Sequence, residues 1–158
     1  MKVRVGFGFD VHQLKEGKDL WLGGIKIAHS KGAVGHSDAD VLIHAICDAL
    51  LGAAGLRDIG FHFPDTSSEF KGIDSKILLD RVNQLLKTEG YSIGNIDCTL
   101  VLEQPKINPH IDSMKKTLAT ILNVEVNDIG IKATTNEKMG YVGREEGVCA
   151  YAVALIQK

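Results

Sequence analysis

The sequence predicts an α+β fold, in which helices pack on one face of a mixed four-stranded sheet that carries a small extra hairpin. Alternating apolar and polar residues indicate four strands, at residues 3–9, 97–103, 129–135 and 148–156. Helical periodicity occupies three stretches, at residues 38–51, 74–89 and 109–123. Because strands and helices are mixed without regular alternation, repeated βαβ units are not expected and the α+β class is favoured.

The N-terminal elements follow from local patterns. In the first strand, apolar residues alternate with Arg4 and two glycines. Residues 20–27 read as two short strand pieces around Gly23-Gly24, which is typical of a hairpin. The helix at 38–51 is apolar nearly all round, so we expect it to be well buried, with Ser37 or Asp38 capping its first turn.

The two later helices have clear boundaries. Asp74 is a candidate cap for the second helix, and Gly90 ends it. Asn108-Pro109 combines a cap with proline at the first helical position of the third helix. With the remaining strands these elements predict a ferredoxin-like arrangement, in which all helices cover the same face of the sheet.

Composition narrows the function classes. The chain has 158 residues, 44% hydrophobic and 24% charged, which suits one catalytic domain over residues 1–158. The formal net charge is −2 and no basic run occurs, so neither nucleic acid nor membrane is an expected partner. No signal pattern is present, so we expect a cytoplasmic location, or a plastid if a transit peptide has been removed. The three cysteines are widely spaced, and we expect reduced, buried thiols.

Three side chains predict a divalent-metal site. Asp10 and His12 are spaced two apart at the end of the first strand, so both side chains share one face. His44 lies on the buried helix in a polar stripe with Asp40 and Asp48. One carboxylate and two imidazoles leave a fourth position open on zinc, and the other two aspartates are candidate partners of the ligating imidazole. The alternatives are a chance surface turn and a stripe that is the helix's solvent face.

Two loops have the composition of a nucleotide diphosphate site. Residues 132–137 contain paired threonines and Glu137, and a Gly-rich loop with Arg144 follows, which suits a phosphate with its own Mg²⁺. His36-Ser37 adds donors before the first helix. Residues 103–109, stiffened by two prolines, could read a flat polar base. The alternatives are an ordinary polar turn and a plain strand-to-helix connection.

With these residues assembled, the chain closely resembles the 2-C-methyl-D-erythritol 2,4-cyclodiphosphate synthase family over essentially its whole length. Each motif alone is weak, but all of them in order and at family spacing make a specific signal. The motifs are Gly8-Phe9-Asp10-Val11-His12, His36-Ser37-Asp38-Ala39-Asp40, Asp58-Ile59-Gly60, Phe63-Pro64-Asp65-Thr66, Pro105-Lys106, Lys132-Ala133-Thr134-Thr135 with Glu137, and Arg144-Glu145-Glu146-Gly147.

The resemblance implies a phosphorus–oxygen lyase of non-mevalonate isoprenoid biosynthesis. Such an enzyme converts 4-diphosphocytidyl-2-C-methyl-D-erythritol 2-phosphate to 2-C-methyl-D-erythritol 2,4-cyclodiphosphate and releases CMP. It also implies a homotrimer with active sites at subunit interfaces, one Zn²⁺ per subunit, and Mg²⁺ or Mn²⁺ at the diphosphate. The competing hypotheses are a zinc-dependent phosphohydrolase and a non-catalytic trimeric module that binds a phosphorylated metabolite.

The resemblance implies a role for each matched position. Asp10, His12 and His44 hold zinc, Glu137 holds the second metal, and His36 and Thr135 steady the transition state. Residues 63–67 line the methylerythritol side and residues 102–108 the cytosine pocket. The substrate contacts implied in this way are Ser37, Asp58, Ile59, Gly60, Phe63, Pro64, Asp65, Thr66, Ser67, Leu102, Pro105, Lys106, Ile107, Asn108, Ala133, Thr134, Tyr141 and Arg144.

Two positions depart from the family pattern. Ser67 stands where many relatives have an acidic residue, so a charge is lost while hydrogen-bonding capacity remains. Tyr141 stands where phenylalanine also occurs, which keeps the ring and adds a hydroxyl. Phe9, Arg144 and Glu146 match positions that line a central cavity of the trimer in relatives.

Overall fold

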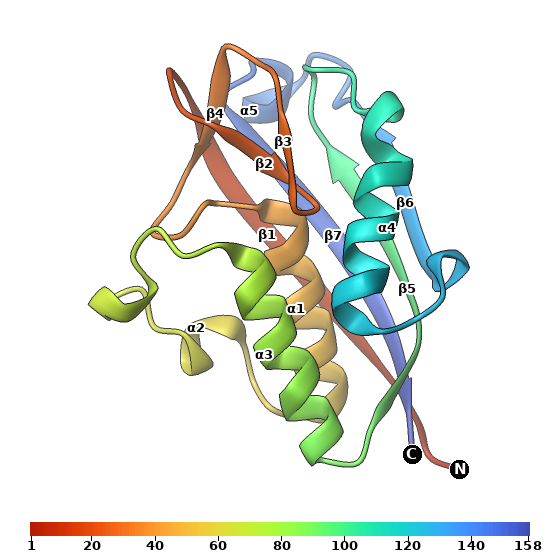
Figure 1. Ribbon diagram of the computed structural model, residues 1–158. Helices are drawn as coiled ribbons and strands as arrows, with labels where there is room; N and C mark the ends of the chain where they lie inside the picture. Colours follow the sequence, from red (N-terminus) through yellow and green to blue (C-terminus); the bar gives the residue numbers. More distant parts are fainter.

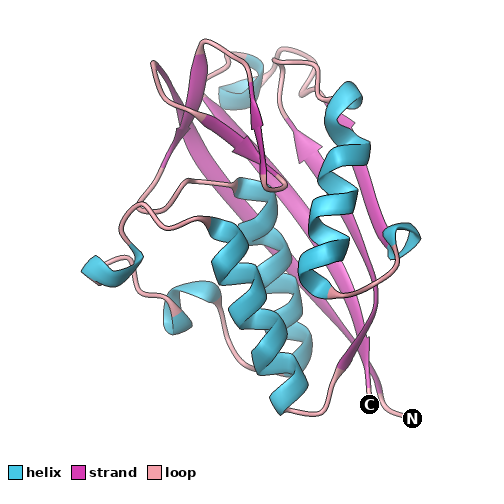
Figure 2. Ribbon diagram, in the orientation of Figure 1, coloured by secondary structure: helices cyan, strands magenta, loops and turns pink.

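A five-stranded mixed sheet runs through the centre of this computed structural model, which describes all residues from 1 to 158, and helices lie against one face of it (Figures 1 and 2). The strand order is β4-β1-β7-β5-β6, with β5 and β6 parallel and every other pair antiparallel. These strands are β1 (Val3–Glu16), β4 (Lys31–Val34), β5 (Ser92–Val101), β6 (Ile129–Thr134) and β7 (Gly147–Gln157). A separate hairpin pairs β2 (Leu20–Leu22) with β3 (Ile25–Ile27).

The α+β class and the hairpin are confirmed, but the prediction of four sheet strands was wrong. The first strand continues to Glu16, and residues 31–34, where no strand was predicted, form β4, which pairs along that extension. β4 is too short to show alternation, and it contains Gly32. A Cβ atom there would lie 2.1 Å from the carbonyl oxygen of Asp19, so the glycine permits close approach of backbone and is not a sign of a loop.

All three predicted helices are present, with shifted boundaries. They are α1 (Val41–Ala54), α3 (Ser75–Thr88) and α4 (Ile111–Leu122), and two four-residue helices, α2 (Ile59–His62) and α5 (Gly140–Gly143), add to them. Asp74 caps α3 as predicted, by accepting a hydrogen bond from the Lys76 N–H. The cap of α1 is Asp40, not Ser37 or Asp38, and Asn108-Pro109 begins a 3₁₀ turn that precedes α4.

Two glycines bring α1 into direct contact with β1. A Cβ atom on Gly8 would lie 1.9 Å from the carbonyl oxygen of Ala45, and one on Gly6 would lie 1.9 Å from that of Ala49. Only glycine lets a helix backbone approach a strand this closely. The packing places His44, next to Ala45, over the middle of β1, where Asp10 lies.

The other face of the sheet has no long helix over it: only the short helix α5 packs there, with Val142 against Val101 and Cys149 at one end. Along β1 and β7 it presents a row of large apolar side chains that are 41–64% exposed: Val3, Val5, Phe7, Phe9, Val11, Tyr151 and Val153. We call this row the open sheet face. No helix in the structure is long and apolar enough to cross a membrane. Cys47, Cys98 and Cys149 are free and buried, as predicted.

Candidate metal centre and flanking pockets

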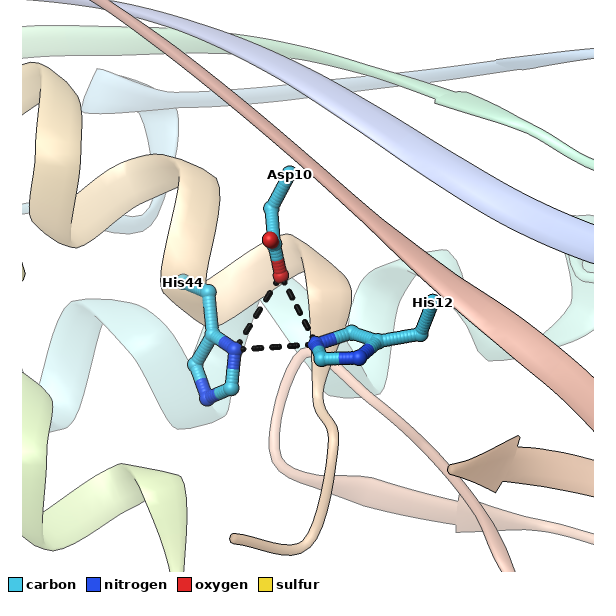
Figure 3. Close-up of side chains that lie close together, drawn as sticks. All are labelled: Asp10, His12 and His44. Carbon is cyan, nitrogen blue, oxygen red and sulfur yellow. Dashed lines mark hydrogen bonds and ion pairs between the residues drawn. The ribbon is translucent and has the colours of Figure 1, made fainter. Parts of the chain in front are cut away.

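Asp10, His12 and His44 converge in the structure as the sequence predicted (Figure 3). The Oδ2 atom of Asp10 lies 2.9 Å from His12 Nε2 and 3.1 Å from His44 Nδ1, and the two ring nitrogens lie 3.2 Å apart. Asp10 and His12 leave β1 on the side of the helices, and His44 reaches them from the first turn of α1. All three residues are half-buried, so the group opens toward solvent on one side.

Each histidine has its outward ring nitrogen occupied by a hydrogen bond. Nδ1 of His12 lies 3.0 Å from the carbonyl oxygen of Val34, which can only accept, so Nε2 turns its lone pair toward the cluster when the ring is neutral. Nε2 of His44 lies near two serine hydroxyls, 2.8 Å from Ser75 and 3.2 Å from Ser37. When both rings are neutral and carry their protons on these outward nitrogens, two ring lone pairs and one carboxylate oxygen face a common point.

The cluster is electrostatically coupled. Burial of the Asp10 carboxyl raises its pKa, but hydrogen bonds with His12 and His44 and their charges outweigh burial and lower that pKa to about 2. Burial lowers the pKa of His12, and the hydrogen bond and charge of Asp10 outweigh it, so the pKa of His12 is raised above its usual value. Both shifts favour an ion pair between the Asp10 carboxylate and the His12 imidazolium when no metal is bound.

The donor set fits a divalent cation. Ligand atoms on a tetrahedral zinc with bonds of about 2.0 Å are about 3.3 Å apart, close to the three observed separations. Two imidazoles and one carboxylate suit zinc among the common divalent ions, and leave a fourth position for a substrate oxygen. The observed geometry therefore needs only a small outward shift to receive an ion.

Asp40 and Asp48 do not contact His44, so the prediction that they accept its ring N–H was wrong. The Asp40 carboxylate is completely buried and accepts hydrogen bonds from the backbone N–H groups of Gly23, Gly24 and Ile43. That of Asp48 accepts from the Ile59 N–H at 2.7 Å. The polar stripe is therefore structural: it ties the hairpin and α2 to α1. It is not the helix's solvent face either.

A cavity of about 400 Å³ opens beside the metal triad. His36 and Ser37 border it on one side, and His36 is held by a 2.9 Å contact between its Nε2 and the carbonyl oxygen of Ser67. We call it the metal-side pocket. It is lined by His12, Gly35, His36, Ser37, His44, Ile59, Gly60, Phe63, Asp65, Phe70, Ile73 and Leu78.

Four predicted substrate-contact residues lie near this pocket without lining it, and they cap short helices or form the loop between them. Asp58 caps α2 by accepting from the Phe61 N–H at 3.2 Å. Ser67 caps the next 3₁₀ turn by accepting from the Glu69 N–H, and Pro64 and Thr66 belong to the exposed loop between these turns.

A second, smaller pocket of about 140 Å³ lies where β5 and β6 end. Its lining coincides with the segments predicted for a base: Leu102, Glu103, Pro105, Lys106, Ile107, Asn108, Ala133, Thr134 and Thr135. We call it the edge pocket. Glu137 follows it on an exposed loop.

The loop that carries Glu137 is held by the Glu103 carboxylate and by hydrogen bonds within the loop, among them one from the Glu137 N–H to the Thr135 hydroxyl at 3.3 Å. Oε1 of Glu103 accepts from the Asn136 N–H at 2.7 Å and from the Lys138 N–H at 3.3 Å. Glu137 and Lys138 both have positive φ, 54° and 60°, which non-glycine residues rarely adopt. Tyr141 lies elsewhere, beside His12 in a shallow hollow, and Arg144 is paired with Glu146.

The two pockets lie far apart in one chain. They share no lining residue. The sheet register puts Thr134 opposite Val101, Val101 opposite Cys149, and Cys149 opposite Val11, next to His12. Three strand spacings of about 4.8 Å separate the two ends of that row by roughly 14 Å.

Sequence reasoning missed several residues of the metal-side pocket. Phe70, Ile73 and Leu78 supply its apolar wall, and their pattern shows only helix and turn packing. Ser75 touches His44 from 31 positions away, so no local signal marks it. Gly35 could have been found from the sequence, because it directly precedes His36. In the structure, a Cβ atom at this position would lie 3.0 Å from the His12 ring.

Comparisons with known proteins agree with this geometry. The model of the YgbB family matches residues 3–157. The chain is 62% identical to 2-C-methyl-D-erythritol 2,4-cyclodiphosphate synthase of Bacteroides thetaiotaomicron, over 100% of this chain and 99% of that protein. It is 65% identical to the protein of the same name from Parabacteroides distasonis, over 100% of this chain and 98% of that protein.

Solved structures give the same result. A 2C-methyl-D-erythritol-2,4-cyclodiphosphate synthase bound to CDP superposes with a TM-score of 0.90 at 36% identity, over 98% of this chain and 100% of that one. The bifunctional IspDF of Campylobacter jejuni gives a TM-score of 0.94 at 38% identity over 98% of this chain. This chain spans 42% of that bifunctional protein. The chain belongs to the YgbB family.

Proposed function

We propose that this chain is a phosphorus–oxygen lyase, which converts 4-diphosphocytidyl-2-C-methyl-D-erythritol 2-phosphate to 2-C-methyl-D-erythritol 2,4-cyclodiphosphate and CMP. The observation that carries the proposal is the Asp10, His12 and His44 triad, open to a pocket, in a chain more than 60% identical end to end to enzymes of that name. We place the reaction in non-mevalonate isoprenoid biosynthesis, and assign the whole of residues 1–158 to one catalytic unit.

The chemistry requires positioning and charge neutralisation more than acid–base power. An oxygen of the 2-phosphate attacks the β-phosphorus, the bond from that phosphorus to the α-phosphate oxygen breaks, and CMP leaves with the electron pair. Because the attacking oxygen is already anionic, no strong base is needed. Zinc at the triad, and Mg²⁺ or Mn²⁺ at Glu137, would supply Lewis-acid neutralisation of the phosphate charge.

The chain's own residues divide the remaining tasks. His36 and Ser37 lie at the rim of the metal-side pocket and donate to phosphate oxygens there. Asp58 and Gly60 bind the sugar diol, and residues 63–67 cover the methylerythritol. The edge pocket, with Pro105, Lys106, Ala133 and neighbouring backbone, receives the cytosine, and Thr134 and Thr135 donate to the diphosphate. We also assign Tyr141 and Arg144 to substrate binding, although each lies outside both pockets.

One substrate must reach both pockets, and this requires a second copy of the chain. The proposed donors for the diphosphate and the proposed zinc site are three strands apart in one chain, whereas they act on neighbouring phosphates. We infer a homotrimer, in which the edge pocket of one copy completes the metal-side pocket of the next. The open sheet face supplies the apolar surface for that contact, since exposed apolar patches of this kind mark interfaces.

Product analysis tests the reaction. The zinc-loaded protein is incubated with the cytidyl diphosphate substrate and Mg²⁺, and the phosphorus products are followed by ³¹P NMR. Cyclic diphosphate with stoichiometric CMP is expected. Linear phosphate products would instead identify a zinc-dependent phosphohydrolase, and binding without turnover would identify a non-catalytic module.

Sedimentation tests the assembly. A species of three chain masses is expected, and Phe7→Glu on the open sheet face is expected to shift it toward monomer. Val126→Glu is the matched control, because Val126 is 38% exposed on a 3₁₀ turn away from that face. A wild-type monomer with full activity would overturn the trimer proposal and leave the reaction untouched.

A further inference from the structure

The second nitrogen of the His44 ring points into the protein, toward the start of α3. Its Nε2 atom lies 2.8 Å from the Ser75 hydroxyl, the first residue of that helix. Ser75 is completely buried. The opposite nitrogen of the same ring, Nδ1, is the one that faces Asp10 and His12. Ser75 therefore contacts a metal-triad ring from behind, where no substrate can reach it.

The Ser75 hydroxyl has a second partner, the carboxylate of Asp38. Ser75 donates its hydroxyl hydrogen to Asp38 Oδ1, because the carboxylate can only accept. With that hydrogen committed, the Ser75 oxygen can only accept from His44 Nε2. In a ring with one proton, this contact favours the proton on Nε2, which leaves the Nδ1 lone pair for an ion, whereas the Asp10 carboxylate, 3.1 Å from Nδ1, favours the opposite tautomer in metal-free protein. The Asp38 carboxylate, which can only accept, thus sets the direction of both hydrogen bonds, from His44 to Ser75 and from Ser75 to Asp38.

The Asp38 carboxylate is itself fixed by backbone. Its Oδ2 accepts from the Ser75 N–H at 2.9 Å, and its Oδ1 accepts from the Asp40 N–H at 3.1 Å. The backbone N–H of Asp38 donates to the carbonyl oxygen of Ile73 at 3.1 Å. These contacts join the segment before α1 to the first turn of α3. The position of the His44 ring therefore depends on both helices.

We propose that Ser75 and Asp38 are positioning residues for the metal site, which hold His44 in the tautomer and ring orientation that present Nδ1 to the ion. Metal-ligating histidines commonly donate their other N–H to an oxygen that fixes the ring in this way. Sequence reasoning assigned this task to Asp40 and Asp48, which do not touch the ring. The inference deepens the proposed function, since it rests on Asp10, His12 and His44 being metal ligands.

Ser37 is the competing partner of the same nitrogen. Its hydroxyl lies 3.2 Å from His44 Nε2 and accepts from the Ala39 N–H at 3.2 Å. Ser37 has no carboxylate behind it, so nothing fixes the direction of its hydroxyl hydrogen. We therefore expect Ser75, not Ser37, to set the tautomer.

The test compares Ser75→Ala and Asp38→Asn with Asp74→Ala. The control removes the side-chain cap of the same helix, one position from Ser75, without touching His44. Zinc affinity is measured by competition with a chromogenic chelator, and the His44 tautomer is read in metal-free protein from ¹⁵N–¹H correlations of the imidazole rings. Thermal unfolding of each metal-free variant reports any general loss of fold.

We expect Ser75→Ala to weaken zinc binding by about 10- to 100-fold, with Asp38→Asn in the same direction. In metal-free Ser75→Ala, proton density is expected to move from Nε2 to Nδ1 of His44. Asp74→Ala is expected to lower the unfolding temperature while wild-type zinc affinity and tautomer persist.

Two results would overturn the inference. One is an unchanged His44 tautomer in Ser75→Ala. The other is a loss of zinc affinity in Asp74→Ala as large as in Ser75→Ala, which would assign the effect to helix stability. Failure of wild-type protein to bind zinc would overturn the metal assignment in the proposed function, and the tautomer measurement on metal-free protein would still decide the role of Ser75.

Discussion

The metal triad and the Glu137 loop are built by opposite means. Asp10, His12 and His44 project from a long strand and a buried helix that touch through glycines, and their ring nitrogens are fixed from behind. Glu137 is exposed on a loop with two consecutive positive-φ residues, which the Glu103 carboxylate and hydrogen bonds within the loop hold. The triad is set by the packing of long elements, whereas the Glu137 side chain lies on a surface loop.

This difference indicates how each half responds to change. A ligand on rigid elements is preorganised, so its removal costs the whole interaction and leaves the scaffold unchanged. A loop with few buried contacts can adjust, so changes there have graded effects. The largest expected effects therefore concern the triad and its scaffold, and smaller ones the loop.

Removal of a triad ligand is expected to have the largest effect. His44→Ala should lower zinc affinity and turnover by more than about a hundredfold, since the ion loses one of three protein ligands. Sedimentation and circular dichroism should remain close to wild type, because His44 is only partly buried. Metal analysis and a CMP-release assay measure these quantities, and full activity in a zinc-free His44→Ala protein would sink the zinc assignment.

The scaffold beneath the triad should be nearly as sensitive. Gly8→Ala puts a Cβ atom 1.9 Å from the Ala45 carbonyl oxygen, so α1 must move away from β1. We expect a loss of about 3 kcal/mol in the free energy of unfolding, measured by urea denaturation. Gly72→Ala is a comparison at a glycine with nothing within 4 Å, where only the positive φ of 69° opposes the change. Equal losses in both would contradict the close-packing explanation.

Loss of the Glu137 carboxylate should have an intermediate effect on turnover. Glu137→Gln keeps the shape of the side chain and removes its charge, so the Mg²⁺ concentration for half-maximal turnover is expected to rise about tenfold. Zinc content should not change. An Mg²⁺ titration identical to wild type would count against Glu137 as a ligand of the second metal.

Protons should compete with zinc at the triad. The pKa of His12 is raised in metal-free protein, so zinc affinity is expected to begin falling, as pH is lowered, at a pH above the ordinary value of 6.5. The slope is at most about tenfold per pH unit for one proton released. Asp10, with a pKa near 2, stays ionised throughout. A flat affinity between pH 8 and 6 would contradict the raised pKa.

Lowering the pH, which weakens zinc binding, should instead stabilise the metal-free protein until Asp10 becomes protonated. Because the folded-state pKa of His12 is raised, its ion pair with Asp10 stabilises the fold fully below pH 6.5 and is lost as pH rises through the raised value. The Asp10 contribution is present above its ordinary value of 3.8 and is lost as pH falls toward 2. The pair is therefore most stabilising between these limits.

Much of the fold and of the triad was accessible from sequence. Period-2 patterns located the long strands and period-3.6 patterns the helices, and the spacing of two in Asp10-Val11-His12 predicted a shared face. β4 was missed because four residues with a glycine show no period. Ser75 was missed because its contact with His44 depends on how α3 packs against α1. Asp40 and Asp48 were predicted to share a polar stripe with His44, but Asp40 is the cap that precedes α1, and both carboxylates accept from backbone groups of the hairpin, α1 and α2.

The distance between the two pockets has a genetic consequence if adjacent copies complete each other's sites. Two variants that damage different halves, such as His44→Ala and Glu137→Gln at limiting Mg²⁺, would restore activity to one another when co-expressed, because some interfaces would then pair an intact triad with an intact loop. Random mixing of equal amounts gives about one quarter of such interfaces. Two variants of the same half would give none, so these alleles would sort into two complementation groups along the division between β1 and β6.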